Sequence, residues 1–185
     1  ENEELFQALV CNEFFSEEPA NEIKSAYLHV TQRCNLHCVG CYSLDSNRNL
    51  LKDPTIEQIK RAIEQLSVND HKIVVISGGE PFLQVEPLLE IVRTAKEKQL
   101  NIWAYSGFTY EELLADESRK RLLVQLDVLV DGKFVNELKD YRLVFKGSRN
   151  QRIIDVQKSL QSGSVILSEK DEQNQKLKEE DMINA

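Results

Sequence analysis

The chain of 185 residues contains no run of about 18 apolar residues, and no basic segment precedes a shorter apolar run. The sequence therefore predicts neither a membrane-spanning helix nor a signal peptide. Basic residues are also in the minority, with 23 Lys and Arg against 31 Asp and Glu and a formal net charge of −8. An acidic balance of this kind argues against a nucleic acid or an anionic membrane as the main partner.

Cysteine is scarce as well. The sequence has four cysteines, and three of them fall within the eight residues from Cys34 to Cys41. This distribution does not resemble a secreted disulfide framework. Clustered thiols without a secretion signal indicate metal binding in the cytoplasm. The hydrophobic share of 41% is that of an ordinary globular protein, and together with the length it predicts a single domain.

Four segments have the apolar pattern of β-strands, and they are residues 26–31, 72–77, 101–105 and 127–130. Helical segments lie between them. One starts with Asp53 as N-cap and Pro54 as its first residue, another opens at Pro87, and a third starts at Tyr110. This alternation favours an α/β fold with a parallel sheet. Because a complete eight-fold barrel needs about 200 residues or more, we predict an open, partial (β/α) barrel with ligands at the carboxyl ends of its strands.

The sequence divides into three predicted segments. Residues 1–25 form an N-terminal extension, in which Glu3–Phe15 has the composition of a short helix. Residues 26–167 form the main domain, which ends with two short strand-like runs, RIIDV and SVIL. Residues 168–185 are charged and contain no aromatic residue, so we expect a mobile tail.

The cysteines form the pattern Cys-x3-Cys-x2-Cys, with Cys34, Cys38 and Cys41, directly after the first predicted strand. Three thiolates on one short loop can bind three irons of a [4Fe–4S] cluster and leave the fourth iron open for chemistry. A structural zinc site with His37 or Cys11 as the fourth ligand is the alternative. The spacing disfavours zinc, because the sequence has no second pair of closely spaced ligands and His37 is adjacent to Cys38.

A second motif, SGGEP, runs from Ser77 to Pro81 after the second predicted strand. Taken alone, it is most simply a tight turn with a solvated acid at Glu80. Parallel strands end at the same edge of a sheet, so this motif and the cysteine loop are expected side by side. Their combination favours a functional role for both.

This pair of motifs resembles the signature of the radical S-adenosylmethionine (SAM) superfamily, and the resemblance covers roughly Ala26 to Leu167. It implies that each cysteine binds one iron, while the amino and carboxylate groups of SAM chelate the fourth. One electron from the cluster then cleaves SAM into methionine and a 5′-deoxyadenosyl radical, which removes hydrogen from an unactivated carbon. The cofactors supply this chemistry, and the protein positions them.

The resemblance also implies roles for single residues. Gly78 and Gly79 would let the backbone approach the methionine part of SAM, Glu80 would orient its ammonium group, and Tyr42 would contact adenine. Ser77 is a further candidate for cofactor binding. Further candidates are Ser106 and Asp131, at predicted strand ends, and either Arg149 or Arg152, for a charge-assisted contact to SAM. The alternatives for this second set are surface turns or structural ion pairs. The remaining residues with notable side chains are expected to be structural, and they are Cys11, His29, His71 and Trp103.

Two features are similar to the activating enzymes of anaerobic ribonucleotide reductase. Gly40 precedes the last cysteine, and the stretches AYSGFTYEELL and LDVLVDGKFVNELKDYRLVFKGSRNQRIIDVQKSL resemble that family closely. The resemblance implies an enzyme that removes hydrogen from a glycine of a large reductase subunit. It also implies a low-potential electron donor of the flavodoxin or ferredoxin type.

The segment before the cysteine loop departs from that family. It reads KSAYLHVTQRCN instead of a glycine-rich stretch, and this run is more similar to radical SAM enzymes that modify ribosomally made peptides. A short precursor peptide is therefore the alternative substrate. The activating enzyme is the preferred interpretation, because its matching stretch is longer.

Overall fold

The computed structural model describes residues 24–31, 33–34, 53–172 and 174–176. Several sequence predictions fall outside these residues and stay predictions. They concern the N-terminal extension with Cys11 and the possible helix at Glu3–Phe15, and also Cys38, Cys41 and Tyr42. Of the helices in the described part, none is long and apolar enough to cross a lipid bilayer.

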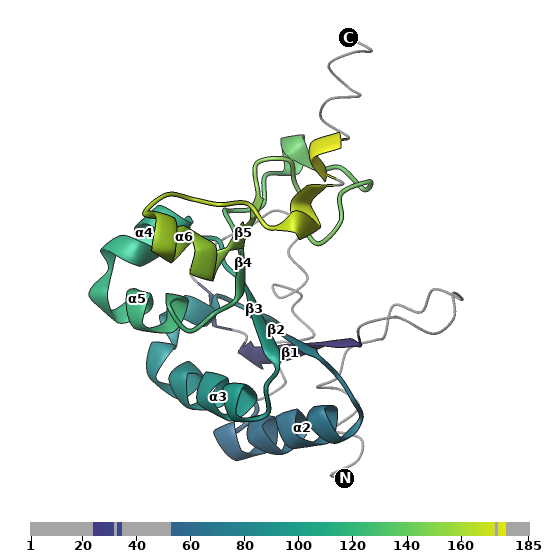
Figure 1. The fold of residues 1–185 in the computed structure, drawn as a ribbon, viewed down its shortest axis with the longest axis vertical. Coiled ribbons are helices and arrows are strands. Elements are labelled where there is room, and N and C mark those ends of the chain that lie inside the picture. The colour runs from purple at the N-terminus through teal and green to yellow at the C-terminus, as the bar shows by residue number, and fades with distance from the viewer. Residues whose placement is uncertain (1–23, 32, 35–52, 173, 177–185) are drawn as a thin grey trace.

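The centre of the structure is a five-stranded sheet with the strands in sequence order (Figure 1). The strands are β1 (Ser25–Thr31), β2 (Ile73–Gly78), β3 (Asn101–Tyr105), β4 (Val128–Asp131) and β5 (Arg152–Asp155). The first four are parallel, and β5 runs antiparallel to β4. The predicted α/β class is thus confirmed, and the sheet is open among the described residues. The four strands that the sequence predicts in order are the parallel ones, and the RIIDV run forms the antiparallel β5.

The direction of β5 follows from the connection before it. A strand parallel to β4 needs a crossover connection, usually a helix, that carries the chain back to the amino ends of the strands. The only helical element of residues 132–151 is one short 3₁₀ turn, η3 (Asn136–Leu138). The chain therefore re-enters the sheet beside the carboxyl end of β4, and β5 runs back along β4 in the opposite direction.

The helices α2 to α6 lie against one face of the sheet (Figure 1). They are α2 (Ile56–Val68), α3 (Val85–Glu97), α4 (Tyr110–Ala115), α5 (Glu117–Leu123) and α6 (Val156–Ser162). Two predicted helix starts are corrected. Thr55, not Asp53, caps α2, because its Oγ1 accepts a hydrogen bond from the Gln58 amide while Gln58 Oε1 accepts one from the Thr55 amide. Helix α3 begins at Val85, two residues before Pro87.

The sheet is apolar on both faces. Alternate strand residues such as Val74, Ile76 and Ile102 pack against the helices in the main core. The residues between them, including Val75, Trp103 and Val130, form a smaller cluster on the opposite face. We call this opposite face the second face of the sheet. Tyr27 and Tyr105 lie beside the smaller cluster and are only partly buried, so the second face is less completely covered than the first.

A small lobe extends beyond the β5 end of the sheet (Figure 1). We define it as the loop 133–150 together with residues 168–172 and 174–176, which include the 3₁₀ turn η4 (Glu169–Asp171). The predicted SVIL strand makes only one isolated bridge, between Leu167 and Ile154. The division at residue 168 stays a prediction. The described part of that segment nevertheless makes buried contacts, because Asp171 and Asn174 are almost fully buried.

Candidate functional site

The start of the cysteine loop and the SGGEP motif lie side by side at the carboxyl ends of β1 and β2. The Glu80 amide donates a hydrogen bond to the Arg33 carbonyl oxygen over 2.8 Å, and Arg33 immediately precedes the half-buried Cys34. The bond therefore joins the backbone of one motif to the residue before the first cysteine of the other. This contact follows the logic of the sequence prediction, since parallel strands end at one edge.

Gly78, the last residue of β2, is the register partner of Thr31, the last residue of β1. Its φ is +99°, a conformation that residues with a Cβ rarely adopt. A Cβ atom at this position would lie 2.5 Å from the Thr31 carbonyl oxygen and 3.0 Å from the His29 ring. The glycine is thus required by the protein's own packing, because a Cβ would overlap the backbone of β1.

Glu80 is not a solvated turn acid, because the residue is only 1% exposed. Its Oε1 accepts hydrogen bonds from the Phe82 amide (3.1 Å) and the Ser106 hydroxyl (3.0 Å), and its Oε2 accepts one from the Gly107 amide (2.8 Å). The carboxylate therefore connects the SGGEP loop to the turn after β3. Burial raises the pKa of Glu80 above its ordinary value, although the three hydrogen bonds oppose that shift.

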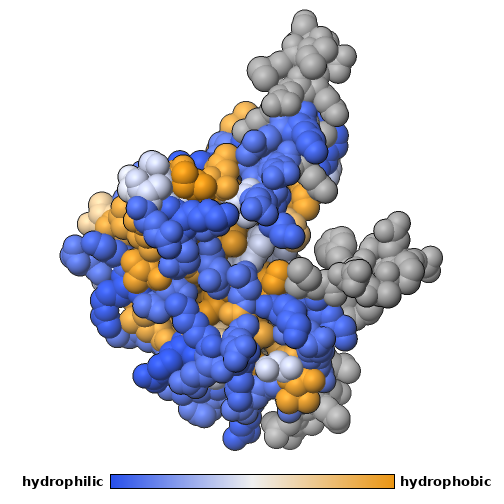
Figure 2. Space-filling model, in the orientation of Figure 1, coloured by the Kyte–Doolittle hydropathy of each residue, from blue (hydrophilic) through white to orange (hydrophobic). Residues whose placement is uncertain are grey.

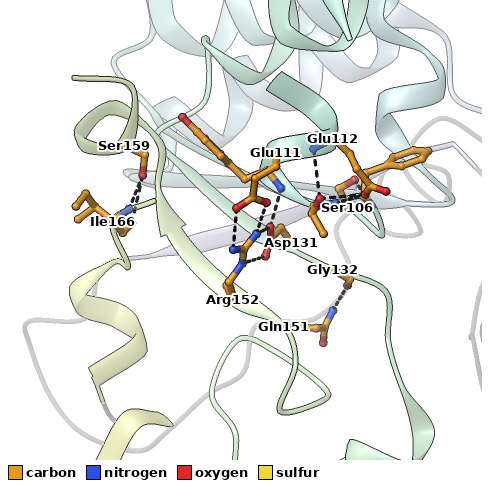
Figure 3. A network of polar contacts seen from close by, with 12 residues as sticks. Ser106, Glu111, Glu112, Asp131, Gly132, Gln151, Arg152, Ser159 and Ile166 are labelled. Carbon is orange, nitrogen blue, oxygen red and sulfur yellow. Dashed lines mark hydrogen bonds and ion pairs between the residues drawn. The ribbon is translucent and has the colours of Figure 1, made fainter. Parts of the chain in front are cut away.

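A second buried carboxylate, Asp131, lies at the end of β4 (Figure 3). Its Oδ2 accepts a hydrogen bond from the Tyr110 amide at the start of α4 (2.7 Å), and its Oδ1 accepts one from Arg152 Nε (3.0 Å). Arg152 also binds both carboxylate oxygens of Glu111, at 3.1 and 2.8 Å. The structure thus gives Asp131 and Arg152 each other as partners, which is the structural ion pair that the sequence left open as an alternative.

The ion pair shifts the ionisation of its members. The hydrogen bond from Arg152 lowers the pKa of Glu111 below its ordinary value. The carboxylates of Asp131 and Glu111 together raise the pKa of Arg152 still further above its usual range. Both shifts favour the charged forms of Glu111 and Arg152. The hydrogen bonds among Asp131, Glu111 and Arg152 hold β4, β5 and α4 together.

The second face brings together further residues at the same edge of the sheet. Ser77 is the register partner of His29, and strand alternation places Ser77 on the same face as Val75. The Tyr105 hydroxyl donates a hydrogen bond to the Phe145 carbonyl oxygen over 2.8 Å, and the rings of Tyr105 and Tyr27 are 6.3 Å apart. The second face therefore offers polar and aromatic side chains beside the two motifs.

Of these residues, only Ser77 is among the site residues that the sequence predicts. Alternation in AYLHVT and NIWAY could have indicated that His29 and Tyr105 share a face with it. The contribution of Phe145 has no signal in the sequence, because it depends on how the loop 133–150 folds back. Trp103 is buried against the sheet, as expected, and its ring lies 5.3 Å from that of Phe145. Arg149 pairs with Asp140 within that loop.

Two hollows flank the beginning of the cysteine loop on the helix side. One has a volume of about 530 Å³ and is lined by Arg33, Leu83 and Arg119, among others. The other, of about 290 Å³, lies between the starts of α2 and α3. Within the part of the chain that the structure describes, no three His, Cys, Asp or Glu side chains gather as metal ligands. Only Cys34 of the cysteine triplet belongs to that part.

Comparison with known proteins gives the family. Residues 25–154 match the family model of the 4Fe-4S single cluster domain. The anaerobic ribonucleoside-triphosphate reductase-activating protein of Haemophilus influenzae is 37% identical over 131 residues, which cover 65% of this chain and 81% of that protein. The proteins of the same name from Pasteurella multocida and Escherichia coli K12 are 33% and 30% identical, and 80% of each is covered. The chain belongs to the family of anaerobic ribonucleoside-triphosphate reductase-activating proteins.

Membership of the reductase-activating family confirms the resemblance found in the C-terminal third of the sequence. The matched region, residues 25–154, begins at the first strand and includes the cysteine loop and the SGGEP motif. None of these comparisons supports the peptide-modifying alternative that the segment before the cysteine loop suggested. The match to a 4Fe-4S single cluster domain also favours an iron–sulfur cluster over the zinc alternative.

Proposed function

We propose that this member of the activating family is a radical SAM enzyme. It uses a [4Fe–4S] cluster to cleave SAM and removes a hydrogen atom from a glycine in the large subunit of an anaerobic ribonucleotide reductase. The observation that carries the proposal is the hydrogen bond between the Glu80 amide and the Arg33 carbonyl, because it couples the SGGEP loop to the beginning of the cysteine loop.

Cys34, Cys38 and Cys41 would hold the cluster. The donor chemistry fits, since three thiolates suit an iron–sulfur cluster with one open iron. The placement of Cys34 also fits, because the residue follows β1 at the sheet edge where ligands bind in α/β proteins. When bound, the cluster and SAM supply one chemical event, the reductive cleavage of SAM to methionine and a 5′-deoxyadenosyl radical.

The residues of the SGGEP motif would bind and orient SAM. Gly78 and Gly79 carry no side chain that could obstruct the approach of SAM to the loop backbone, and Ser77 precedes them. Because all three hydrogen bonds of the Glu80 carboxylate go to the protein, we propose that this carboxylate holds the loop in shape, while the ammonium group of SAM is received by the loop as a whole. Tyr42 remains the proposed adenine contact.

The other candidates would act through the scaffold. Ser106 holds Glu80, and Asp131 and Arg152 fix the ends of β4 and β5. These groups keep the carboxyl edge of the sheet rigid, so that SAM and the glycine segment meet in one geometry. The sheet would then be the partial barrel of a radical SAM enzyme, with the second face directed toward the substrate. A low-potential donor of the flavodoxin or ferredoxin type would deliver the electron.

The test is anaerobic reconstitution with iron and sulfide, followed by incubation with SAM and a strong reductant. The wild-type chain is expected to bind about four irons and to release 5′-deoxyadenosine. Cys38→Ala is expected to abolish the product, whereas Cys11→Ala is a matched control that removes a cysteine outside the triplet. A preparation that holds stoichiometric zinc and releases no 5′-deoxyadenosine contradicts the proposal.

A further inference from the structure

The lobe exposes large side chains in a short stretch of sequence. Tyr141 is 88% exposed, and Leu138 and Phe145 of the same loop are each 41% exposed. Figure 2 shows apolar surface among hydrophilic surface on this part of the molecule. Between Leu138 and Tyr141, Lys139 places its ammonium group 4.7 Å from the centroid of the Tyr141 ring. Aromatic residues such as Tyr141 and Phe145 are enriched in protein interfaces relative to the rest of the surface.

The loop that carries these side chains is held rigidly. Asp140 accepts hydrogen bonds from the Arg142 guanidinium (3.0 and 2.8 Å) and from the Arg149 guanidinium (3.1 and 2.6 Å). The bonds from Arg142 lower the pKa of the Asp140 carboxyl far below its ordinary value. Tyr141, which lies between Asp140 and Arg142, is therefore presented from a fixed backbone although its ring is exposed.

The segment after residue 168 fixes the loop from the other side. Lys146 and Asp171 form an ion pair of 2.6 Å whose side chains are 1% and 3% exposed. The Asn174 side chain accepts a hydrogen bond from the Val144 amide and donates one to the Val144 carbonyl. A surface that is already ordered loses little conformational entropy when a partner binds, which favours its use as a docking site.

The charge of the loop differs from that of the whole chain. Residues 133–150 contain five basic and two acidic residues, whereas the whole chain contains 23 basic and 31 acidic residues. Of this basic set, Lys146 is buried in its ion pair, while Lys133 and Lys139 are exposed and contribute positive charge to the surface. A basic, partly apolar surface on an acidic protein selects a partner whose facing surface is acidic and offers an apolar contact.

The lobe also adjoins the proposed site. Phe145 contacts Trp103 and Tyr105, so the loop closes one side of the second face. Any protein that brings a glycine to the second face therefore passes next to the lobe. We propose that Leu138, Lys139 and Tyr141 form a docking surface for an acidic, partly apolar surface on the large reductase subunit. The identity of this partner rests on the proposed function.

The experiment measures the affinity of the chain for the large subunit of the anaerobic reductase from the same organism, in parallel with SAM cleavage in the absence of that subunit. The double variant Lys139→Glu/Tyr141→Ala is expected to weaken the affinity at least about tenfold. The affinity of the wild type is expected to fall as salt rises, and that of the variant to depend less on salt. Cleavage of SAM without the subunit is expected to be unchanged.

A matched control changes the same types of side chain elsewhere. Two exposed residues serve for this control: Val68, which is 77% exposed and ends α2, and Lys98, which follows the last residue of α3. Both precede the amino end of the next strand, away from the carboxyl ends where the proposed site lies. The double variant Val68→Ala/Lys98→Glu is expected to bind like the wild type. Because Lys139→Glu alone replaces an exposed side chain, it serves as a second variant that is expected to fold normally.

Two outcomes overturn the proposal. One is an unchanged affinity for the large subunit in both Lys139 variants. The other is a loss of self-association in these variants with no change toward the subunit, which would assign the surface to a second copy of the chain. If the wild type cleaves no SAM, the proposed function fails, but the affinity measurement still decides whether this surface docks the subunit.

Discussion

Two buried carboxylates at the carboxyl ends of β2 and β4 are held in different ways. Glu80, after β2, accepts hydrogen bonds only from neutral donors, namely two backbone amides and the Ser106 hydroxyl. Asp131, at the end of β4, faces the guanidinium of Arg152 as well as one backbone amide. Both residues are 1% exposed. Neutral donors satisfy hydrogen-bond geometry without balancing charge, and burial raises the pKa of Glu80, the carboxyl beside the cysteine loop, above its ordinary value.

The largest effect is expected from Asp131→Asn. The amide keeps the shape but removes the charge opposite Arg152, which then retains Glu111 as its acidic partner. We expect the free energy of unfolding to fall by about 2–3 kcal/mol, below the full value for a buried pair because Arg152 is about one-third exposed. Urea unfolding measures this. A loss no larger than that of an ordinary surface substitution would show that the ion pair does not stabilise β4 and β5.

A smaller loss is expected from Glu80→Gln, because its partners are neutral. The amide oxygen can still accept from Phe82 and Ser106, while the amide nitrogen meets the Gly107 N–H, which donates to the carboxylate in the wild type. We expect a loss of about 1–2 kcal/mol. The same unfolding experiment measures it, and a loss greater than that of Asp131→Asn would reverse the comparison between the two carboxylates.

The exposed member of the ion pair is expected to contribute least. The Glu111 side chain is 58% exposed, and solvent screens its interaction with Arg152. Glu111→Gln is therefore expected to lower the free energy of unfolding by less than about 1 kcal/mol at neutral pH. An effect equal to that of Asp131→Asn would mean that the two carboxylates hold Arg152 jointly and that burial is not the deciding factor.

The pH dependence is the finest test, because the two glutamates are expected to respond in opposite directions. The pKa of Glu80 is raised in the folded state, so Glu80 binds a proton more readily in the folded protein than in the unfolded chain. The wild type therefore gains stability relative to Glu80→Gln as pH falls toward the ordinary carboxyl range. The pKa of Glu111 is lowered, so the wild type loses stability relative to Glu111→Gln as pH falls through that range. Unfolding curves from pH 7 to about pH 4 measure both differences, and parallel trends would contradict the assignment.

The juxtaposition of Arg33 and Glu80 could be predicted from the sequence, because parallel strands must end at one edge. The partners of Glu80 could not, since Ser106 and Gly107 are ordinary turn residues until β3 lies beside β2. The pairing of Asp131 with Arg152 depends on the antiparallel direction of β5, and the strand pattern of RIIDV carries no information on direction.

The lobe shows the same limit of sequence patterns. The charged composition after Ser168 predicts a tail, because composition does not reveal which charges are paired. Asp171 is buried only because Lys146, 25 positions earlier in the chain, supplies its counter-charge. Helix starts are also decided by local bonds: Thr55 has a reciprocal partner in Gln58, while Asp53 accepts instead from Thr31.

The central claim is that this chain takes a hydrogen atom from a glycine of the large reductase subunit. The most direct test mixes the reconstituted, reduced chain with SAM and a large subunit produced with glycine deuterated at Cα. The account predicts a glycyl radical signal by electron paramagnetic resonance and deuterium in the 5′-deoxyadenosine that is released. Release of 5′-deoxyadenosine without deuterium and without that signal would contradict the claim, and it would direct the search to a different substrate.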